Sequence, residues 1–189
     1  MPGLQFYIEL IDSDPKIFRR VVVPFEYTFH KFHLAIQGAF GWENSHLFRF
    51  SETGFEDKLS YEELTEDSNT YPEFVVKDAR RSKIKLVFTH DKKKFVYIYD
   101  FGDSWKHLIV HEKFVDKEIE RPYCIDGAGA CPPEDCGGMR GYECMLATLK
   151  TPNDPERTNY IEWLGLAPNE KWDESFCSIR EVNKRLCLL

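Results

Sequence analysis

The chain has 189 residues, of which 42% are hydrophobic and 15% aromatic, so it can bury the core of a single domain spanning 1–189. Its formal net charge of −7 weakens attraction to nucleic acid and anionic lipid, so nucleic acid is the least favoured partner, although a local basic patch stays open. There is no apolar run of the ~20 residues that a membrane helix needs, and no signal sequence at the start. We therefore expect a cytoplasmic protein that does not bind membranes. Its six cysteines should be thiols or metal ligands.

The first part of the chain predicts strands around one helix. Alternating apolar and polar residues indicate strands over 4–10, 18–23 and 45–50. Thr28 suits the N-cap of a helix, because its hydroxyl can accept from a free backbone N–H. Apolar residues then recur at helical spacing as far as Phe40, and Gly41 provides the left-handed residue that ends the helix.

The middle of the chain predicts a surface excursion followed by three antiparallel strands. Residues 52–77 are acidic and rich in turn formers, with a short helix at 61–64 as an alternative. The strands are expected over 84–88, 95–99 and 105–114. Their connections are short enough for antiparallel hairpins.

The last third predicts a shaped loop and then helices. Residues 121–138 contain four glycines and three prolines, which indicates a functional loop without a regular element. Helices are expected after Gly138, from Pro155 to Leu164, and after the capping box that begins at Ser178. The order indicates an α+β fold, in which an antiparallel sheet packs against the N-terminal helix and the C-terminal helices close the core.

Polar and aromatic side chains gather in three loops. The candidate cleft residues are Trp42 and His46 after the first helix, Asp100, Asp103, Trp105 and His107 around the 99–105 turn, and Glu134 and Asp135 in the proline-rich loop. We expect these loops to converge at one sheet margin as a polar cleft with aromatic walls. Such a cleft suits a binding or regulatory module for a protein or small ligand, and a homodimer stays open.

Several of these side chains are also metal ligands by type. The candidate ligands of a divalent metal ion are His46, Asp103, Glu134, Cys131 and Cys136. The cysteine spacing only approximates the C-x2–4-C pairs of structural zinc sites, so it is a weak signal. A metal-dependent hydrolase using His46, Asp103 and Glu134 or Asp135 is the alternative to a binding module.

Each candidate also has a purely structural interpretation. Asp100 and Asp103 could cap their turn through side-chain hydrogen bonds. His46 could be an ordinary hydrogen-bonded strand residue, and the adjacent carboxylates of Glu134 and Asp135 could face the N-terminus of the next helix.

A basic strip offers the remaining alternative, a DNA-associated protein. It comprises Lys77, Arg80, Arg81, Lys83, Lys85, Lys92, Lys93 and Lys94. It lacks the interleaved aromatic residues that stack on bases, so lysines protecting an edge strand are the commoner explanation. Phosphate-loop, dinucleotide-binding, zinc-protease and nucleophile-elbow motifs are all missing from the sequence.

Three motifs together resemble a known family. They are Gly41-Trp42-x-x-x-His46-Leu47, then Tyr97-x-Tyr99-Asp100-Phe101-Gly102-Asp103-x-Trp105-x-His107, then the loop from Gly127 to Gly138 with its Cys-Pro-Pro-Glu-Asp-Cys core. The chain is similar to the family named for the third open reading frame of a root-inducing plasmid, whose members are also labelled TnpR-like passengers of insertion elements. The resemblance implies one α+β domain associated with mobile elements, and it assigns no catalytic role to any residue.

Overall fold

The computed structural model describes residues 1–66, 68, 73–167 and 170–189. These residues form one eight-stranded sheet in the order β5-β4-β3-β6-β7-β1-β2-β8. The strands are β1 (Gly3–Leu10), β2 (Phe18–Pro24), β3 (Phe48–Ser51), β4 (Leu59–Glu62), β5 (Val75–Asp78), β6 (Lys94–Tyr99), β7 (Trp105–Val115) and β8 (Tyr123–Ala128). All neighbours pair antiparallel except β4 and β5, which are parallel. The expected α+β class is confirmed, and the expected antiparallel pairing is confirmed for all neighbours except β4 and β5.

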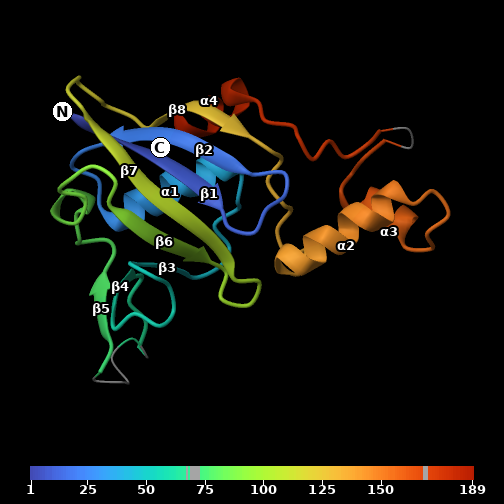
Figure 1. Ribbon diagram of the computed structural model, residues 1–189, viewed down its shortest axis with the longest axis horizontal. Coiled ribbons are helices and arrows are strands. Elements are labelled where there is room, and N and C mark those ends of the chain that lie inside the picture. Colours follow the sequence, from blue (N-terminus) through green and yellow to red (C-terminus); the bar gives the residue numbers. More distant parts are fainter. Residues whose placement is uncertain (67, 69–72, 168–169) are drawn as a thin grey trace.

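Helix α1 (Phe29–Phe40) covers one face of the sheet (Figure 1). The Thr28 side chain accepts from the Lys31 N–H at 3.2 Å, and Gly41 ends the helix with φ 100°, so both predicted caps are confirmed. Phe6 of β1 meets Phe32 of α1 at a ring distance of 4.6 Å, and both are fully buried. The core therefore lies between α1 and the inward side chains of the sheet.

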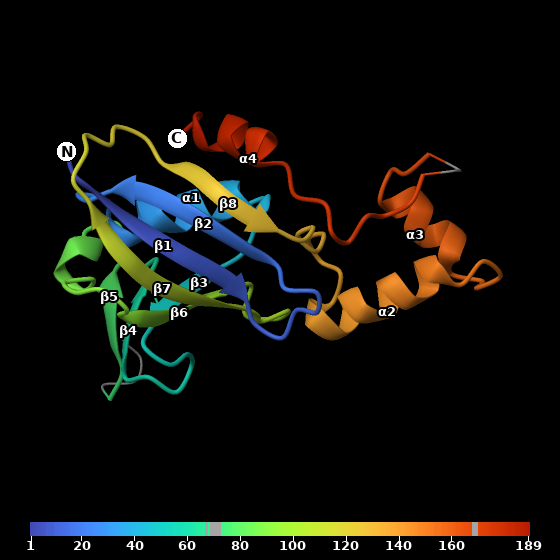
Figure 2. The same cartoon turned by 45° about the horizontal axis from the view of Figure 1, so that its top comes forward.

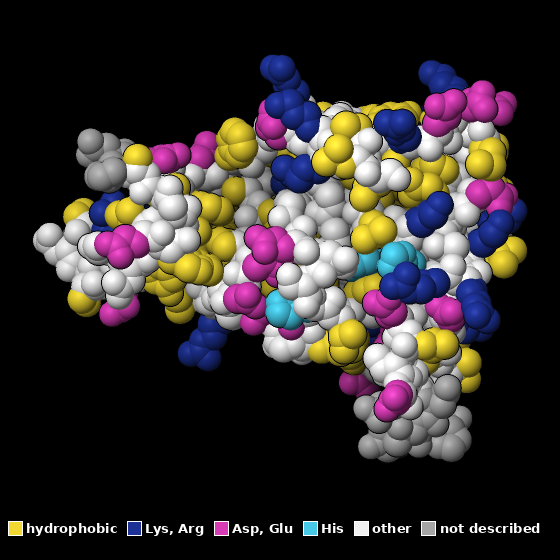
Figure 3. Space-filling model, turned by 180° about the vertical axis from the view of Figure 1, so that it is seen from behind, with side chains coloured by type: hydrophobic (Ala, Val, Ile, Leu, Met, Phe, Trp, Pro, Cys, Tyr) yellow, Lys and Arg dark blue, Asp and Glu magenta, His cyan; other side chains and the backbone are white. Residues whose placement is uncertain are grey.

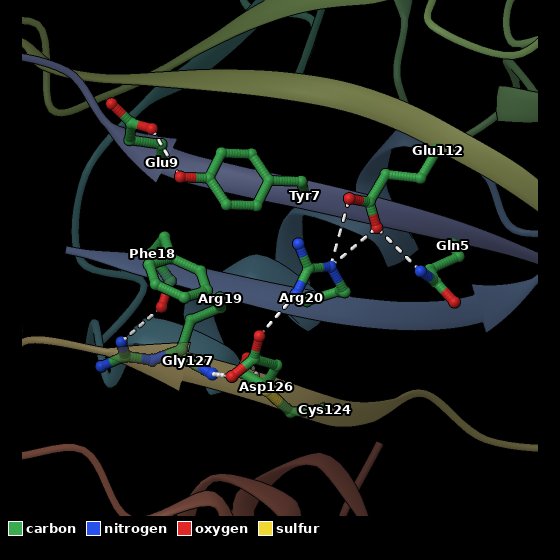
Figure 4. Close-up of polar contacts among 10 residues, drawn as sticks. All are labelled: Gln5, Tyr7, Glu9, Phe18, Arg19, Arg20, Glu112, Cys124, Asp126 and Gly127. Atoms are coloured by element: carbon green, nitrogen blue, oxygen red, sulfur yellow. Dashed lines mark hydrogen bonds and ion pairs between the residues drawn. The ribbon is translucent and has the colours of Figure 1, made fainter. Parts of the chain in front are cut away.

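The opposite sheet face carries polar side chains in an ordered network (Figure 4). Arg20 donates to Glu112 at 2.8 Å and to Asp126 at 2.5 Å, which links β2 to β7 and β8. The Tyr7 hydroxyl donates to Glu9 at 2.6 Å. Because side chains alternate along a strand, Tyr7 and Arg20, which is paired with it on β2, point away from the α1 face.

Two predictions for the middle of the chain are wrong. Residues 84–88 do not form a strand: Ile84–Leu86 is a short 3-10 helix. Ile84 and Phe88 are both fully buried, and a spacing of four residues places side chains on one side in a helix and in a strand alike. The helix considered for 61–64 does not form: residues 61 and 62 belong to β4, because Tyr61 pairs with Phe50 across the sheet and stacks on Phe29 at 4.0 Å. The 52–77 excursion thus contains the sheet edge formed by β4 and β5.

The proline-rich region also contains a strand that was not expected. Strand β8 (Tyr123–Ala128) pairs with β2, so residues 121–138 are not irregular throughout. A Cβ atom on Gly127 would lie 2.9 Å from the Arg19 side chain and 3.0 Å from the Phe18 carbonyl oxygen. Glycine is therefore required here by close packing within the sheet, and its presence gave a false loop signal.

The three C-terminal helices are placed differently from one another. Helix α4 (Ile179–Leu186) packs on α1 and β8 and buries Val182 and Leu186. Helices α2 (Gly138–Lys150) and α3 (Arg157–Trp163) extend from the body as an arm in both ribbon views (Figures 1 and 2). The buried side chains of α2 are those of Tyr142 and Met145. Within the described ranges, no helix is long and apolar enough to cross a membrane.

Candidate functional site

Three loops distant in sequence meet at one end of the sheet. The Asp100 N–H in the β6–β7 turn donates to the Leu47 carbonyl, in the segment after α1, at 2.9 Å. In the same turn the Asp103 carboxylate accepts from the Gly137 N–H at 3.0 Å. Glu134, in the proline-rich loop, accepts from the Glu43 N–H at 2.6 Å. The hairpin turn and the proline-rich loop therefore lie against each other, beside the end of α1.

At this meeting point an acid–imidazole cluster forms from His46, Asp100, Glu134 and Asp135. The His46 Nε2 atom lies 3.0 Å from an Asp135 oxygen, 3.7 Å from an Asp100 oxygen and 3.8 Å from a Glu134 oxygen. The Asp100 and Glu134 side chains are 12% exposed, against 30% for His46 and 72% for Asp135. Figure 3 shows acidic and histidine side chains together on the surface between the arm and the β4–β5 edge. The cluster is thus walled on one side and open to solvent on the other.

Two polar atoms of the acid–imidazole cluster are buried without a hydrogen bond. Among the described residues, neither His46 Nε2 nor Glu134 Oε2 has a partner with hydrogen-bond geometry. Buried polar atoms are normally satisfied, so each such atom needs an explanation. The ligand atoms of His46, Asp100 and Asp135 all lie within 4.8 Å of one another, which is a spacing that one ion can bridge.

Tyr99 ties two of the loops together behind the cluster. Its hydroxyl donates to Glu134 Oε1 at 2.9 Å and accepts from the Ser45 N–H at 2.9 Å. Burial, reinforced by the neighbouring Glu134 carboxylate, raises the pKa of Tyr99. The phenol therefore stays protonated and continues to donate, which fixes Glu134 relative to the segment that carries His46.

A closed circuit of four side chains anchors the segment before His46. The Asn44 N–H donates to Gln37 Oε1 at 2.8 Å, and Gln37 Nε2 donates to the Tyr97 hydroxyl at 2.8 Å. His33 completes it, with Nδ1 at 2.8 Å from the Tyr97 hydroxyl and Nε2 at 2.5 Å from Asn44 Oδ1. Burial lowers the pKa of His33 to about 3, so its ring is neutral. A neutral ring that donates from Nε2 to Asn44 and accepts at Nδ1 from Tyr97 satisfies every member of the circuit.

The backbone around the cluster takes unusual conformations. Asn44, Asp100 and Asp135 have φ values of 56°, 55° and 56°, in the left-handed region. Asn and Asp are the side-chain-bearing residues that tolerate this region best. Because Asp100 has this geometry, its side chain leaves the alternation of β6 and turns toward His46, which a pattern of period two cannot predict.

The aromatic candidates lie behind the acid–imidazole cluster in the core. Trp105 and His107 are fully buried, and Trp42 covers Trp105 at a ring distance of 5.1 Å with 6% exposure. His107 contacts the Trp105 carbonyl through Nδ1 at 3.0 Å, and burial lowers its pKa to about 4. These residues support the cluster from within, and Tyr99 is the aromatic side chain that touches it.

The remaining candidate ligands do not surround His46. The Asp103 carboxylate accepts a hydrogen bond from the Gly137 N–H, which joins the β6–β7 turn to the proline-rich loop. Burial raises the pKa of the Cys136 thiol to about 12, and it also raises that of Cys131. The structure therefore brings Asp100 and Asp135 to His46 in place of Asp103, Cys131 and Cys136. All six cysteines are free.

Five of the eight residues of the basic strip pair with carboxylates. Lys83 and Lys85 both pair with Glu26, and Lys93 pairs with Glu52. Arg80 pairs with Glu63, and Arg81 with Asp78. Phosphate binding would have to replace these pairs, which weakens the strip as a nucleic-acid surface.

The fold and the acid–imidazole cluster define an α+β protein with a mostly antiparallel eight-stranded sheet and a carboxylate-rich site at one sheet margin. The chain belongs to the Plasmid pRiA4b ORF-3-like protein family, whose model matches residues 2–181, and the predicted resemblance is confirmed. The chain is 36% identical over 181 residues to the Uncharacterized protein y4hQ of Sinorhizobium fredii (strain NBRC 101917 / NGR234), covering 94% of this chain and 87% of the relative. It is also similar to the crystal structure of a protein of unknown function, MM3350 from Methanosarcina mazei Go1. That comparison has a TM-score of 0.79 and 27% identity, and it covers 95% of this chain and 97% of the other.

Proposed function

We propose that the protein is a binding or regulatory module that holds a divalent metal ion between His46, Asp100 and Asp135, with Glu134 as a further ligand. The observation that carries this proposal is the buried Nε2 atom of His46. It lies 3.0 Å from an Asp135 oxygen and is also close to two more carboxylates, yet it makes no hydrogen bond within the described part of the chain. A cation between these atoms would satisfy the imidazole and the carboxylates together.

The electrostatics of the acid–imidazole cluster support a cation. Three carboxylates converge on one imidazole and repel one another, and two of them have side chains only 12% exposed, which limits relief by water. A divalent ion removes most of that repulsion. Imidazole with carboxylates suits Zn²⁺, Mn²⁺ or Fe²⁺ better than Mg²⁺ or Ca²⁺, which prefer oxygen ligands alone.

One observation favours the second candidate, a metal-dependent hydrolase. The Asp135 side chain is 72% exposed and that of His46 is 30% exposed, so one side of the proposed ion faces solvent. Catalytic metal sites keep such an open position for water or substrate. Glu134 Oε2, which lacks a partner in the described residues, would then accept a proton from the attacking water.

Metal titration tests the proposal. Protein without a histidine tag is freed of metal with a chelator and titrated with Zn²⁺ and Mn²⁺ by calorimetry. We expect one equivalent to bind. Saturation at about 100 times Kd should stabilise the fold by about 2.7 kcal/mol. His46→Ala should abolish binding, while His90→Ala, at an exposed histidine outside the cluster, should leave it unchanged. If neither ion binds in stoichiometric amount, the proposal is wrong.

Two aspartates from the same turn provide a matched comparison. Asp100→Asn keeps the left-handed backbone and the hydrogen bond from the Gly102 N–H, but it removes a ligand charge. Asp103→Asn keeps an acceptor for the Gly137 N–H and lies outside the set of ligand atoms around His46. We expect at least tenfold weaker metal binding in the first variant and wild-type binding in the second. The reverse result would favour the ligand set predicted from sequence.

A further inference from the structure

Helix α2, which forms the base of the arm, begins with weak local signals. Its N-cap is Gly137, which has no side chain to accept a hydrogen bond from the first turn. Gly138 and Gly141 occupy two of its first four positions, and glycine favours a helix less than any residue except proline. Helix α4 differs, because Ser178 accepts from the Glu181 N–H at 3.3 Å and caps it. The start of α2 therefore depends on contacts with the rest of the protein.

The β6–β7 turn provides those contacts. The Asp103 carboxylate accepts from the Gly137 N–H at 3.0 Å, and a Cβ atom on Gly138 would lie 2.7 Å from the Asp103 carbonyl oxygen. Further along the arm, α2 buries two side chains, and α3, which is described in full, buries none. The segment after the arm adds a hydrogen bond from the Ala130 N–H to the Glu174 carbonyl at 2.9 Å. The arm is thus held mainly at its base, where the turn meets the start of α2 (Figure 2).

Two proposed metal ligands lie on the two sides of this contact between turn and helix. Asp100 belongs to the β6–β7 turn, three residues before Asp103, and Asp135 lies two residues before Gly137. Their ligand atoms lie within 4.8 Å of each other. Without an ion the two carboxylates repel each other across the contact, and Asp135, with a side chain 72% exposed, is free to move away. An ion bound to both would replace this repulsion by a bridge beside the hydrogen bond from Gly137 to Asp103.

We propose that metal binding at the acid–imidazole cluster orders the start of α2 and so fixes the arm to the body, with Asp103 as a positioning residue. This inference rests on the metal site proposed above. Because Asp135 and Gly137 belong to one short stretch of chain, fixing the first limits where the second can lie. Coupling between two sites is reciprocal, so an ion that orders the helix start must bind more weakly when that start is loosened. The presence of the ion is thereby converted into the order of a protruding surface, which suits a regulatory module.

Hydrogen exchange with and without Zn²⁺, followed by mass spectrometry, tests the proposal. Protein freed of metal with a chelator is compared with the same protein loaded with Zn²⁺. We expect the amides of residues 139–146 to exchange about fivefold or more slowly after loading, the lower end of typical coupling between two sites. Helix α4 is the matched control, because its own side-chain cap orders it without the ion, and its exchange should change little. Equal slowing in α2 and α4 would reflect only the general stabilisation by a bound ligand and would overturn the proposal.

Two substitutions at Asp103 separate positioning from metal ligation. Asp103→Asn keeps an acceptor for the Gly137 N–H, and Asp103→Ala removes it. In metal-free Asp103→Ala, exchange at residues 139–146 should be faster than in the wild type. Its affinity for Zn²⁺ should fall by about two- to tenfold, as expected for the loss of one hydrogen bond. Asp103→Asn should behave as the wild type in both measurements, and an equal loss of affinity in the two variants would make Asp103 a ligand and overturn its positioning role.

Calorimetry on the same samples keeps the two proposals apart. Stoichiometric binding of Zn²⁺ without selective slowing at residues 139–146 overturns the proposed ordering of the arm and leaves the metal site standing. Failure of the wild-type protein to bind either Zn²⁺ or Mn²⁺ overturns the proposed function, and this inference with it. The comparison of wild-type protein with and without the ion does not depend on the folding of either variant.

Discussion

The circuit of His33, Gln37, Asn44 and Tyr97 gives the most direct test of how the site is built. Tyr97→Phe removes one oxygen atom from a fully buried ring. That oxygen is the acceptor for Gln37 Nε2 and the partner of His33 Nδ1, each at 2.8 Å. The substitution therefore leaves one buried donor and one buried acceptor without a partner, and no other change in shape is required.

The size of the effect follows from those two atoms. An unsatisfied buried polar group costs about 1–3 kcal/mol, so Tyr97→Phe, which leaves two, should lower the free energy of unfolding by about 2–6 kcal/mol. Tyr7→Phe is the matched control, because the Tyr7 hydroxyl makes one hydrogen bond, to Glu9, on the half-exposed sheet face. Its loss should stay below about 1.5 kcal/mol.

Urea unfolding followed by far-UV circular dichroism measures both variants. We expect the midpoint of Tyr97→Phe to fall well below that of Tyr7→Phe at an unchanged slope. Metal affinity should fall only in Tyr97→Phe, because the circuit positions Asn44 two residues before His46. Equal destabilisation of the two variants would show that the circuit does not hold this loop.

Two further predictions concern packing and pH. Gly138→Ala places a Cβ atom 2.7 Å from the Asp103 carbonyl oxygen at φ +70°, whereas at Gly165, with φ +64°, nothing lies within 4 Å. Both variants should lose about 1–2 kcal/mol from the left-handed backbone. Overpacking should cost Gly138→Ala about 1–3 kcal/mol more by thermal or urea unfolding, and equal losses would contradict the close approach. Burial lowers the pKa of His33 to about 3 and that of His107 to about 4. Between these values and about pH 6.5, the unfolded chain therefore binds more protons than the folded chain. With a chelator present, the free energy of unfolding should therefore be at its full value above about pH 6.5. It should be lower by about 1.4 kcal/mol per histidine at pH 5.5. A free energy of unfolding equal at pH 7.5 and 5.5 would refute the neutral assignment.

The helix caps and most strands follow from local pattern. The limits of helix α1 were predictable from single residues. The Thr28 hydroxyl caps the N-terminus, and Gly41, which has no side chain, adopts the left-handed conformation that ends the helix. Strand β8 was not, because Gly127 reports a close approach of Arg19 that exists only after the sheet has assembled. Tyr61 is likewise in a strand because Phe29 and Phe50 surround it.

In the candidate site, too, some features follow from the local sequence and others depend on the assembled fold. The three loops could be selected from their polar and aromatic composition, and the structure brings them together. The choice of Asp100 over Asp103 depends on a left-handed backbone at residue 100, with φ 55°, which turns the carboxylate out of the strand alternation. The role of Tyr99 was hidden because an aromatic residue in a strand pattern resembles any core residue. Its hydroxyl contacts depend on two loops that are distant in sequence.

The left-handed conformations of Asp100 and Asp135 have a consequence for how such a chain can change. At these two positions the left-handed main chain favours Asp, Asn or Gly over longer side chains. Replacing either aspartate by glutamate would strain the backbone in addition to moving the carboxylate. Changes in side-chain length are therefore a costly way to adjust the affinity of the proposed site for an ion. Exchange between the acid and its amide stays open, and it changes charge without changing loop shape. The proposed ion binding would thus be lost by one substitution and regained by its reversal, with the scaffold intact in either form.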